Sequence, residues 1–231
     1  MLGKDLQPSL ERVGHLVQGF DLPELDITES KQVLTCLNGT RPDIVINCAA
    51  YTAVDKAESE PDIAFAVNRD GSANLAEPCG FLDIPLIYLS TDHVFDGHAQ
   101  RGYREDDPAN PPNVYGQSKW AGEEAIRTQL AEHIIVRTSW LYGVHGNNFV
   151  KTMLRLSREQ EELRVVVDQH GCPTWTGDLA EALVLMIGRI CANQTVIRYG
   201  TYHFCGGGFT TWYDFAQEIL NGDGSRRLPE G

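Results

Sequence analysis

Short apolar runs alternate with helical segments along most of the 231-residue chain, and this alternation strongly limits the possible fold. The apolar runs predict strands over residues 15–20, 43–48, 84–90, 134–138 and 163–167. The helical segments predict helices over residues 28–37, 60–79, 113–130, 148–160 and 178–190. Strands that alternate with helices form parallel β-α-β units, so we predict an α/β fold with a doubly wound parallel sheet of Rossmann type.

Local signals add detail to this pattern. Thr28 is expected to cap the first predicted helix, and Pro61 suits the first turn of the second. Residues 97–112 are rich in Gly, Asp, Asn and Pro and predict a surface loop. Residues 193–208 predict a short strand and a glycine turn, and the polar stretch 221–231 is expected to fray.

The start of the chain departs from the usual pattern of a nucleotide-binding domain. Such a domain opens with an apolar strand and a glycine-rich turn, whereas here Met1, Leu2 and Gly3 lead directly into a helical segment. We expect Gly3 to be the last glycine of that turn, with the first strand and the earlier glycines outside this sequence. Without this central strand its neighbours lose backbone partners, so we expect the 231 residues alone to fold poorly and to bind little dinucleotide.

The charge balance argues against one broad class of partner. Nineteen basic and thirty-two acidic residues give a net charge of −13, and such a chain repels nucleic acid and anionic membranes. No apolar run approaches the roughly 18 residues that a membrane helix needs, and residues 1–10 lack the apolar core of a signal peptide. We therefore expect a cytoplasmic protein that binds neither nucleic acid nor membranes. We further expect it to be a monomer or a homodimer.

The cysteines point to the same compartment. None of them forms a C-x-x-C pair, so the spacing indicates neither a zinc site nor a thioredoxin-type motif. We expect reduced, buried thiols and no metal site. The six are Cys36, Cys48, Cys79, Cys172, Cys191 and Cys205.

Tyr115 and Lys119 stand four residues apart on a predicted helix, which places a phenol and an ammonium on one face. A nearby ammonium favours the phenolate and lowers the pKa of the tyrosine toward working pH. Such a phenol exchanges a proton with a carbonyl or an alcohol. On its own this spacing is more often a surface pair of the helix, so it needs support from elsewhere in the chain.

That support comes from Thr91 and Asp92, which follow the predicted strand 84–90. Ligands of open α/β sheets bind at the carboxyl ends of the strands, where Thr91 can hydrogen-bond a substrate oxygen. The alternative is that these polar residues only cap the next turn. A strand-end threonine followed 24 residues later by Tyr-x-x-x-Lys is the layout of the short-chain dehydrogenase/reductase superfamily.

Longer blocks make the resemblance more specific. The chain resembles the dTDP-4-dehydrorhamnose reductase family, an extended branch of that superfamily, from Gly3 to about Leu220. The blocks that carry the resemblance are Asn47–Glu58, Ser90–Gly97, Tyr115–Lys119, Arg137–Tyr142, Gly146–Phe149, Asp168–Thr174 and Thr211–Ala216.

The resemblance implies a reaction and its residues. Thr91, Tyr115 and Lys119 would be the catalytic triad: Tyr115 would protonate the C4 oxygen of a dTDP-4-keto sugar as NADPH or NADH delivers hydride, and Lys119 would hold the nicotinamide ribose. The product would be dTDP-L-rhamnose, for cell-surface polysaccharide. Thr91 and Asp92 would hold the sugar, and Trp140 would pack beside it, with a core aromatic as the alternative for Trp140.

The resemblance also implies a cofactor site. Its further lining residues would be Leu2, Gly3, Asp21, Asp26, Ile27, Ala49, Ala50, Tyr51 and Thr52. Asp26 and Ile27 would lie near the adenine, although Asp26 alternatively caps the turn before Thr28. Asp21 ends the predicted strand 15–20, where a carboxylate accepts from the ribose 2′-hydroxyl and repels a 2′-phosphate, which favours NADH.

Two departures from the family pattern stand out. His93 replaces the usual tyrosine, and the family's Arg-Arg-Pro step and final helix are not recognisable in residues 225–229.

Two other functions are alternatives to the reductase. The chain could be an NAD-dependent nucleotide-sugar epimerase or dehydratase, or a non-catalytic regulatory relative. We expect residues 1–140 to be mainly dinucleotide-binding and 141–231 to be mainly a substrate lobe, with some elements returning to the sheet.

Overall fold

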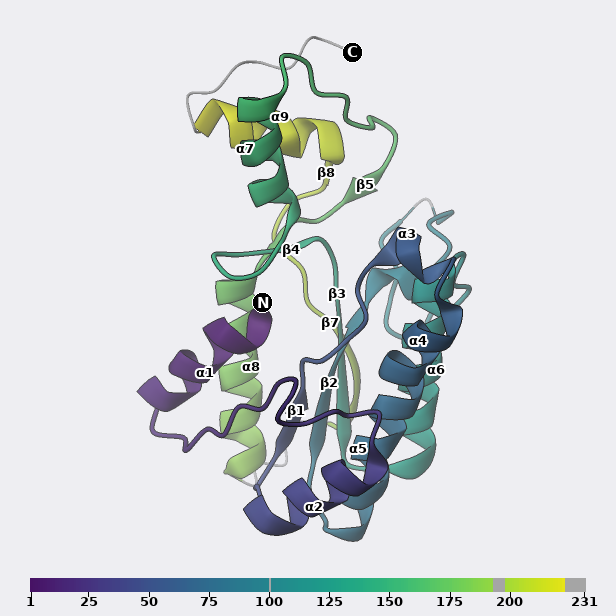
Figure 1. Cartoon of the computed structure of the whole chain (residues 1–231), viewed down its shortest axis with the longest axis vertical. Helices are drawn as coiled ribbons and strands as arrows, with labels where there is room; N and C mark the ends of the chain where they lie inside the picture. The colour runs from purple at the N-terminus through teal and green to yellow at the C-terminus, as the bar shows by residue number, and fades with distance from the viewer. Residues whose placement is uncertain (100, 193–197, 223–231) are drawn as a thin grey trace. The chain divides into compact units, whose positions relative to one another are not determined.

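The computed structural model describes residues 1–99, 101–192 and 198–222, and they group into two compact units. The sheet unit comprises residues 18–138 and 186–203, and the second unit comprises 1–17, 139–185 and 204–222, each as far as it is described. The break at 138/139 lies close to the expected boundary at residue 140, but residues 1–17 group with 139–185 and not with 18–138. Figure 1 traces the chain through both units.

The sheet unit is built on four parallel strands in the order β1-β2-β3-β7. They are β1 (Val45–Asn47), β2 (Leu86–Thr91), β3 (His133–Thr138) and β7 (Gly200–His203). Every residue of β2 is buried, as expected for an apolar run inside a parallel sheet. The predicted α/β fold with a parallel sheet is confirmed, together with the strands predicted over 43–48, 84–90, 134–138 and within 193–208.

The helices of the sheet unit are α2 (Ser30–Thr40), α3 (Val54–Ala57), α4 (Pro61–Phe65), α5 (Gly71–Phe81) and α6 (Val114–Gln129), with a 3₁₀ turn η2 (Asp92–Val94). Between α4 and α5 lies one π-helical turn, η1 (Ala66–Asp70), so residues 61–81 form the single long helical stretch that the sequence predicts. Pro61 stands in its first turn, also as predicted. Figure 1 shows α5 and α6 beside the strands and α2 near their lower ends.

The main core of the sheet unit lies between these helices and the strands. Side chains from α2, α5 and α6 meet the buried residues of β2 and β3 in one cluster: Val33, Leu37, Leu75, Ala76, Cys79, Ile84, Leu86, Tyr88, Ile126, Leu130 and Ile135. Burying apolar surface of this extent dominates the free energy of folding. It fixes α5 and α6 against the sheet, and α6 carries Tyr115 and Lys119.

The second unit contains α1 (Leu2–Arg12), α7 (Phe149–Glu159), α9 (Trp212–Gly222) and most of α8 (Thr176–Cys191), which continues into the sheet unit. The second unit also contains two short strand pairs. Strand β4 (Leu141–Tyr142) pairs in parallel with β6 (Thr174–Trp175), and β5 (His170–Gly171) pairs antiparallel with β8 (Thr210–Thr211). Helices α7 and α9 share a small core around Met153, Ala216 and Leu220. The helices predicted over 148–160 and 178–190 are therefore confirmed.

Two predicted strands are wrong. Residues 15–20 and 163–167 have no regular structure. A strand needs a neighbouring backbone to pair with, and β1 is the edge strand of the described sheet, with no described residue pairing along its outer side. Leu163 and Val165 still pack against the α7–α9 core, so the apolar pattern reports burial and not a strand.

Other local predictions are also corrected. Thr28 does not cap α2, which begins after Glu29 without a side-chain cap, because the Thr28 hydroxyl donates to Asp26 instead. Only Cys79 is buried, whereas Cys48, Cys191 and Cys205 are exposed thiols. Residues 97–99 and 101–112 form the predicted loop. The fraying expected at 221–231 falls, from residue 223 onward, outside the described residues.

Candidate active site

The centre of the candidate site is the carboxyl end of β2. Thr91 is the last residue of this strand and is buried. Its hydroxyl donates to a carboxylate oxygen of Asp92 at 3.2 Å and accepts from the backbone N–H of His93 at 3.3 Å. Burial raises the pKa of Asp92, and His93 opposes this rise. Thr91 thus starts the turn η2, as the capping alternative required, and its hydroxyl also faces Tyr115.

Helix α6 begins beside this turn because of a side-chain cap. The Asn113 carboxamide oxygen accepts from the Gly116 N–H at 2.8 Å, and its nitrogen lies 3.1 Å from Nδ1 of His93. A side chain at position 116 would stand 2.2 Å from the His93 carbonyl oxygen, so only glycine allows this approach. The result places Tyr115 edge-on to the His93 ring, with centroids 5.4 Å apart.

Tyr115 is buried at the end of β2. Burial raises the pKa of its phenol to about 12, a hydrogen bond with Thr91 lowers it, and the charge of Asp92 raises it. The expectation that Lys119 lowers this pKa toward working pH is therefore wrong for the described structure. The phenol instead keeps its proton at neutral pH, which is the state of a proton donor.

Lys119 lies one turn further along α6 and is 1% exposed. Its ammonium donates to the Leu89 carbonyl at 2.7 Å and sits 4.0 Å from the centre of the Tyr88 ring. Burial lowers the pKa of Lys119 to about 7, and the charges of Glu123 and Cys48 oppose this. The alternative of a surface pair is wrong, because both Tyr115 and Lys119 are buried.

A second glycine brings α6 close to the rest of the sheet unit. A Cβ at Gly122 would stand 2.2 Å from the carbonyl oxygen of Asn68 and 2.7 Å from the Tyr88 hydroxyl. Asn68 lies in the π-helical turn η1 and is buried. Its side chain donates to Ser118 on α6 at 2.9 Å, so this close contact is also hydrogen-bonded.

The segment Ala49–Thr52 follows β1 at the same edge of the sheet. Asn68 holds it, because its side chain accepts from the Tyr51 N–H at 2.9 Å and donates to the Tyr51 carbonyl at 3.0 Å. The Tyr51 hydroxyl donates to Glu60 at 2.8 Å. Tyr51 also packs against the small cluster that contains Tyr115. The predicted cofactor segment and the predicted triad therefore lie together in the sheet unit.

Asp26 and Asp21 both use their carboxylates locally. Asp26 accepts from the N–H and the hydroxyl of Thr28 at 2.9 and 2.7 Å, which is the turn that the alternative predicted. Asp21 accepts from the Leu22 N–H at 2.9 Å and lies in a turn, because the strand it was expected to end is not formed. Ile27 packs against Gly71, where a Cβ would stand 2.6 Å from its side chain.

Leu2, Gly3 and Trp140 belong to the second unit. Leu2 and Gly3 form the first turn of α1. Trp140 stacks on Trp212 with ring centroids 3.5 Å apart, and a Cβ on Gly171 would stand 2.4 Å from its indole. Its backbone φ of 46° is in the left-handed region, which is costly for a bulky residue and is found most often at functional sites.

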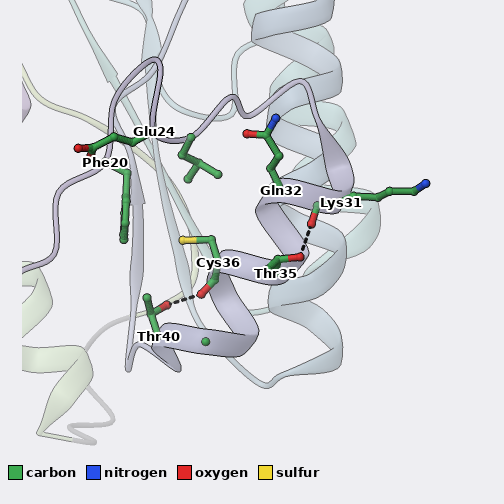
Figure 2. A pocket seen from close by; sticks show the side chains of 9 residues that line it. Phe20, Glu24, Lys31, Gln32, Thr35, Cys36 and Thr40 are labelled. Carbon is green, nitrogen blue, oxygen red and sulfur yellow. Dashed lines mark hydrogen bonds between the residues drawn. The ribbon is translucent and has the colours of Figure 1, made fainter.

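A cavity of about 560 Å³ lies between α2 and the segment at residues 20–25, which contains Asp21. Figure 2 shows its lining, which includes Phe20, Lys31 and Cys36. None of the predicted catalytic side chains lines it. Within the described residues, no group of three or more His, Cys, Asp or Glu side chains could hold a metal ion, and no helix is both long and apolar enough to cross a membrane.

Sequence reasoning missed several residues that build the site. Asn68 binds the segment after β1, and Asn113 caps the start of α6. Glu123 is the charged group that raises the pKa of Lys119 against the effect of burial. For Glu123 a signal was present, since it stands four residues after Lys119 and eight after Tyr115, on the same face of a helix.

Comparisons with known proteins agree with this geometry. The family model described as "RmlD substrate binding domain" matches residues 1–229. A dTDP-4-dehydrorhamnose reductase of Streptomyces griseus is 45% identical, over 99% of this chain and 76% of its own length. The reductase of Escherichia coli K12 is 42% identical, over 95% of this chain and 74% of its own.

Solved structures give the same result. The crystal structure of dTDP-4-dehydrorhamnose reductase from Bacillus anthracis, described as a complex with NADP, is 42% identical with a TM-score of 0.91, over 100% of this chain and 80% of that one. The UDP-glucose 4-epimerase of Thermus thermophilus, at 21% identity and a TM-score of 0.79, shares the fold. The chain belongs to the dTDP-4-dehydrorhamnose reductase family.

Proposed function

We propose that the protein reduces the C4 ketone of dTDP-4-dehydrorhamnose to dTDP-L-rhamnose with NADPH or NADH, for cell-surface polysaccharide synthesis. The observation that carries the proposal is the buried cluster of Thr91, Tyr115 and Lys119 in a chain 42–45% identical to such reductases. The cytoplasm, which supplies both nucleotide sugars and reduced dinucleotide, is the proposed location.

The residues at the strand ends fit a bound dinucleotide. Lys119 is buried, yet among the described residues only the Leu89 carbonyl accepts from its three N–H donors. Two donors of a buried ammonium without partners suit the hydroxyls of a ribose. The dinucleotide, when bound, supplies the hydride. The similar reductase of Bacillus anthracis binds NADP, and Ala49, Ala50, Tyr51 and Thr52 are the proposed neighbours of the cofactor in this chain.

Tyr115 is the proposed proton donor. Its phenol is protonated at neutral pH and lies beside Thr91, where a substrate carbonyl oxygen can accept from both hydroxyls. As negative charge develops on that oxygen, the Tyr115 proton moves to it, and the Thr91 hydroxyl holds the oxygen in place. The Lys119 ammonium lies one turn away on α6 and is the proposed partner of the ribose hydroxyls.

Thr91 and Asp92 are proposed to hold the sugar. Asp92 is half-buried beside Thr91, and its carboxylate oxygens can accept hydrogen bonds from sugar hydroxyls. Trp140 is the proposed stacking partner of the substrate, supported by its strained backbone. Leu2, Gly3, Asp21, Asp26 and Ile27 remain proposed cofactor neighbours. We further propose that residues before about 140 mainly bind dinucleotide and those after it mainly bind the nucleotide sugar.

The activity is tested by following NADPH absorbance at 340 nm. We expect oxidation with dTDP-4-dehydrorhamnose and none without a sugar nucleotide. An epimerase or dehydratase would convert its substrate without net consumption of NADPH, and a non-catalytic relative would do neither. The absence of absorbance loss with authentic substrate and folded protein would reject the proposal.

A comparison of two substrates distinguishes this reaction from a related reduction. A protein of Streptomyces niveus named dTDP-4-keto-6-deoxy-D-glucose reductase is 40% identical to this chain. We expect dTDP-4-dehydrorhamnose to be reduced with the higher kcat/KM of the two 4-keto sugars. A preference for the D-glucose-configured ketone would assign the chain to that reaction.

A further inference from the structure

Glu123 lies one turn beyond Lys119 on α6 and is equally buried, with no exposed side-chain surface. An ionised carboxylate in such a place needs several partners, because water does not reach it. The mechanism above assigns it no role. Its position on the face of α6 that carries Tyr115 and Lys119 makes it the nearest anionic group along this helix.

Three side chains saturate this carboxylate. One oxygen accepts from the Ser90 hydroxyl at 2.5 Å and from Nε of Arg137 at 3.0 Å. The other oxygen accepts from Nη2 of Arg137 at 2.8 Å and from Nη2 of Arg127 at 2.7 Å. Two guanidinium groups and a hydroxyl thus give Glu123 charge-assisted hydrogen bonds in the interior.

Arg137 is itself fixed. It is 3% exposed, and its guanidinium carbon lies 5.0 Å from the Phe95 ring centre and 5.7 Å from that of Trp120. Arg127 differs, since 27% of its side chain is exposed and it also pairs with the exposed Glu124. The carboxylate of Glu123 therefore has one rigid buried counter-charge and one that water screens.

Three consecutive residues of β2 join this network to the site. The Leu89 carbonyl accepts from Lys119, the Ser90 hydroxyl donates to Glu123, and Thr91 faces Tyr115. A displacement of Glu123 would therefore act on the strand that also holds Lys119 and Thr91.

The other titratable groups around the two site residues are few. Besides Glu123, the groups near the Lys119 ammonium are Cys48 after β1 and Tyr88 on β2. On η2, Asp92 and His93 face Tyr115. In the described part of the chain, Glu123 is therefore the only carboxylate among the groups that lie near Lys119.

We propose that Glu123 is a positioning residue for the reduction, whose carboxylate keeps the Lys119 side chain charged and in place, while Arg137 and Arg127 limit how much of that negative charge Lys119 experiences. This inference rests on the proposed function only for the role of Lys119. The coupling between the two side chains is a property of the protein itself.

The coupling is measured directly by NMR. The chain has five lysines, so protein labelled with ¹³C at lysine Cε gives few signals, and a Lys119→Met variant assigns that of Lys119. We expect Glu123→Gln to lower the pKa of Lys119 by about 1 unit, because an opposite charge is lost. Arg127→Gln is expected to raise it by about half a unit, because Glu123 loses a counter-charge that is partly screened.

Opposite shifts from the two variants cannot arise from general loss of structure. Arg127 is partly exposed, so its variant remains informative if Glu123→Gln does not fold, as judged by circular dichroism and the melting temperature. Glu124→Gln is the matched control: it also pairs with Arg127 but is 53% exposed, and we expect the pKa of Lys119 to stay within about 0.2 units.

A second readout links the coupling to the reaction. In the kcat–pH profile, we expect the alkaline limb to move to lower pH in Glu123→Gln and to higher pH in Arg127→Gln. A Lys119 pKa that does not change in either folded variant would overturn the inference. If the pKa of Lys119 shifts as expected but neither the wild type nor any variant oxidises NADPH, the coupling between Glu123 and Lys119 is supported and the proposed function is rejected.

Discussion

The Lys119 ammonium lies against the face of the Tyr88 ring, 4.0 Å from its centre, and neither side chain reaches solvent. Burial lowers the pKa of Lys119 from 10.5 to about 7. An unfolded chain restores the ordinary pKa, so between pH 7 and 10.5 the unfolded state binds more protons than the folded state. The contribution of Lys119 to the free energy of unfolding therefore rises with pH across this window.

Lys119→Met should remove this pH dependence. We expect the free energy of unfolding of the wild type, relative to that of the variant, to increase by a few kcal/mol (about 1.4 per pH unit) from pH 7 to pH 10. Urea titrations at pH 7, 8.5 and 10 measure it. Lys31→Met, at an exposed position of α2, should show no such trend. A difference that stays constant with pH would mean that water reaches the ammonium.

Tyr115→Phe should separate catalysis from binding. The ring contacts with His93 and the surrounding cluster survive, while the proton donor is lost. We expect kcat to fall by about 10²–10⁴-fold with little change in substrate affinity, measured by steady-state kinetics and by calorimetry. Tyr202→Phe, which loses only a contact with the Arg198 carbonyl, is the control. Near-normal turnover of Tyr115→Phe would place the donor elsewhere.

Gly122→Ala should destabilise the protein and impair the site together. The new Cβ meets the Asn68 carbonyl and the Tyr88 hydroxyl at 2.2 and 2.7 Å, so α6 must move. We expect a loss of about 1–3 kcal/mol in the free energy of unfolding. Gly188→Ala in α8 has open space around it and should stabilise by about 0.5–1 kcal/mol. Equal effects of the two substitutions would show that α6 is free to adjust.

Asp21→Ala addresses the choice of cofactor. If the carboxylate faces the ribose, its removal should raise kcat/KM for NADPH relative to NADH, because repulsion of the 2′-phosphate is lost. The exposed Glu24 of the same turn supplies the control, Glu24→Gln. An unchanged ratio, together with lower stability, would limit Asp21 to its bond with the Leu22 N–H.

The sequence predicted the parts of the fold that periodicity determines. Buried strands such as Leu86–Thr91 and amphipathic helices such as Val114–Gln129 carry their own signal. Residues 15–20 carry the same apolar signal, but a strand also depends on a partner elsewhere in the chain, which local sequence does not report.

The site shows the same division. Thr91, Tyr115 and Lys119 were predicted from spacing and from resemblance, and the structure brings them together. The ionisation of Lys119 was not predictable, because it depends on burial and on Glu123. Asn68 was missed since its role comes from contacts with Tyr51 and Ser118, which are 17 and 50 residues away.

The π-helical turn at Ala66–Asp70 affects how the helical stretch 61–81 packs against two hydrophobic clusters. A π turn holds one residue more than an α-helical turn, and each residue turns an α-helix by about 100°. The stretch after it is therefore rotated about the helix axis relative to the stretch before it. Ala64 packs with the small cluster around Tyr115, whereas Leu75, Ala76 and Cys79 pack in the main core. Deleting one residue from this turn would rotate the stretch after it by about 100° relative to the stretch before it, so that Leu75, Ala76 and Cys79 would turn away from the main core if Ala64 kept its place.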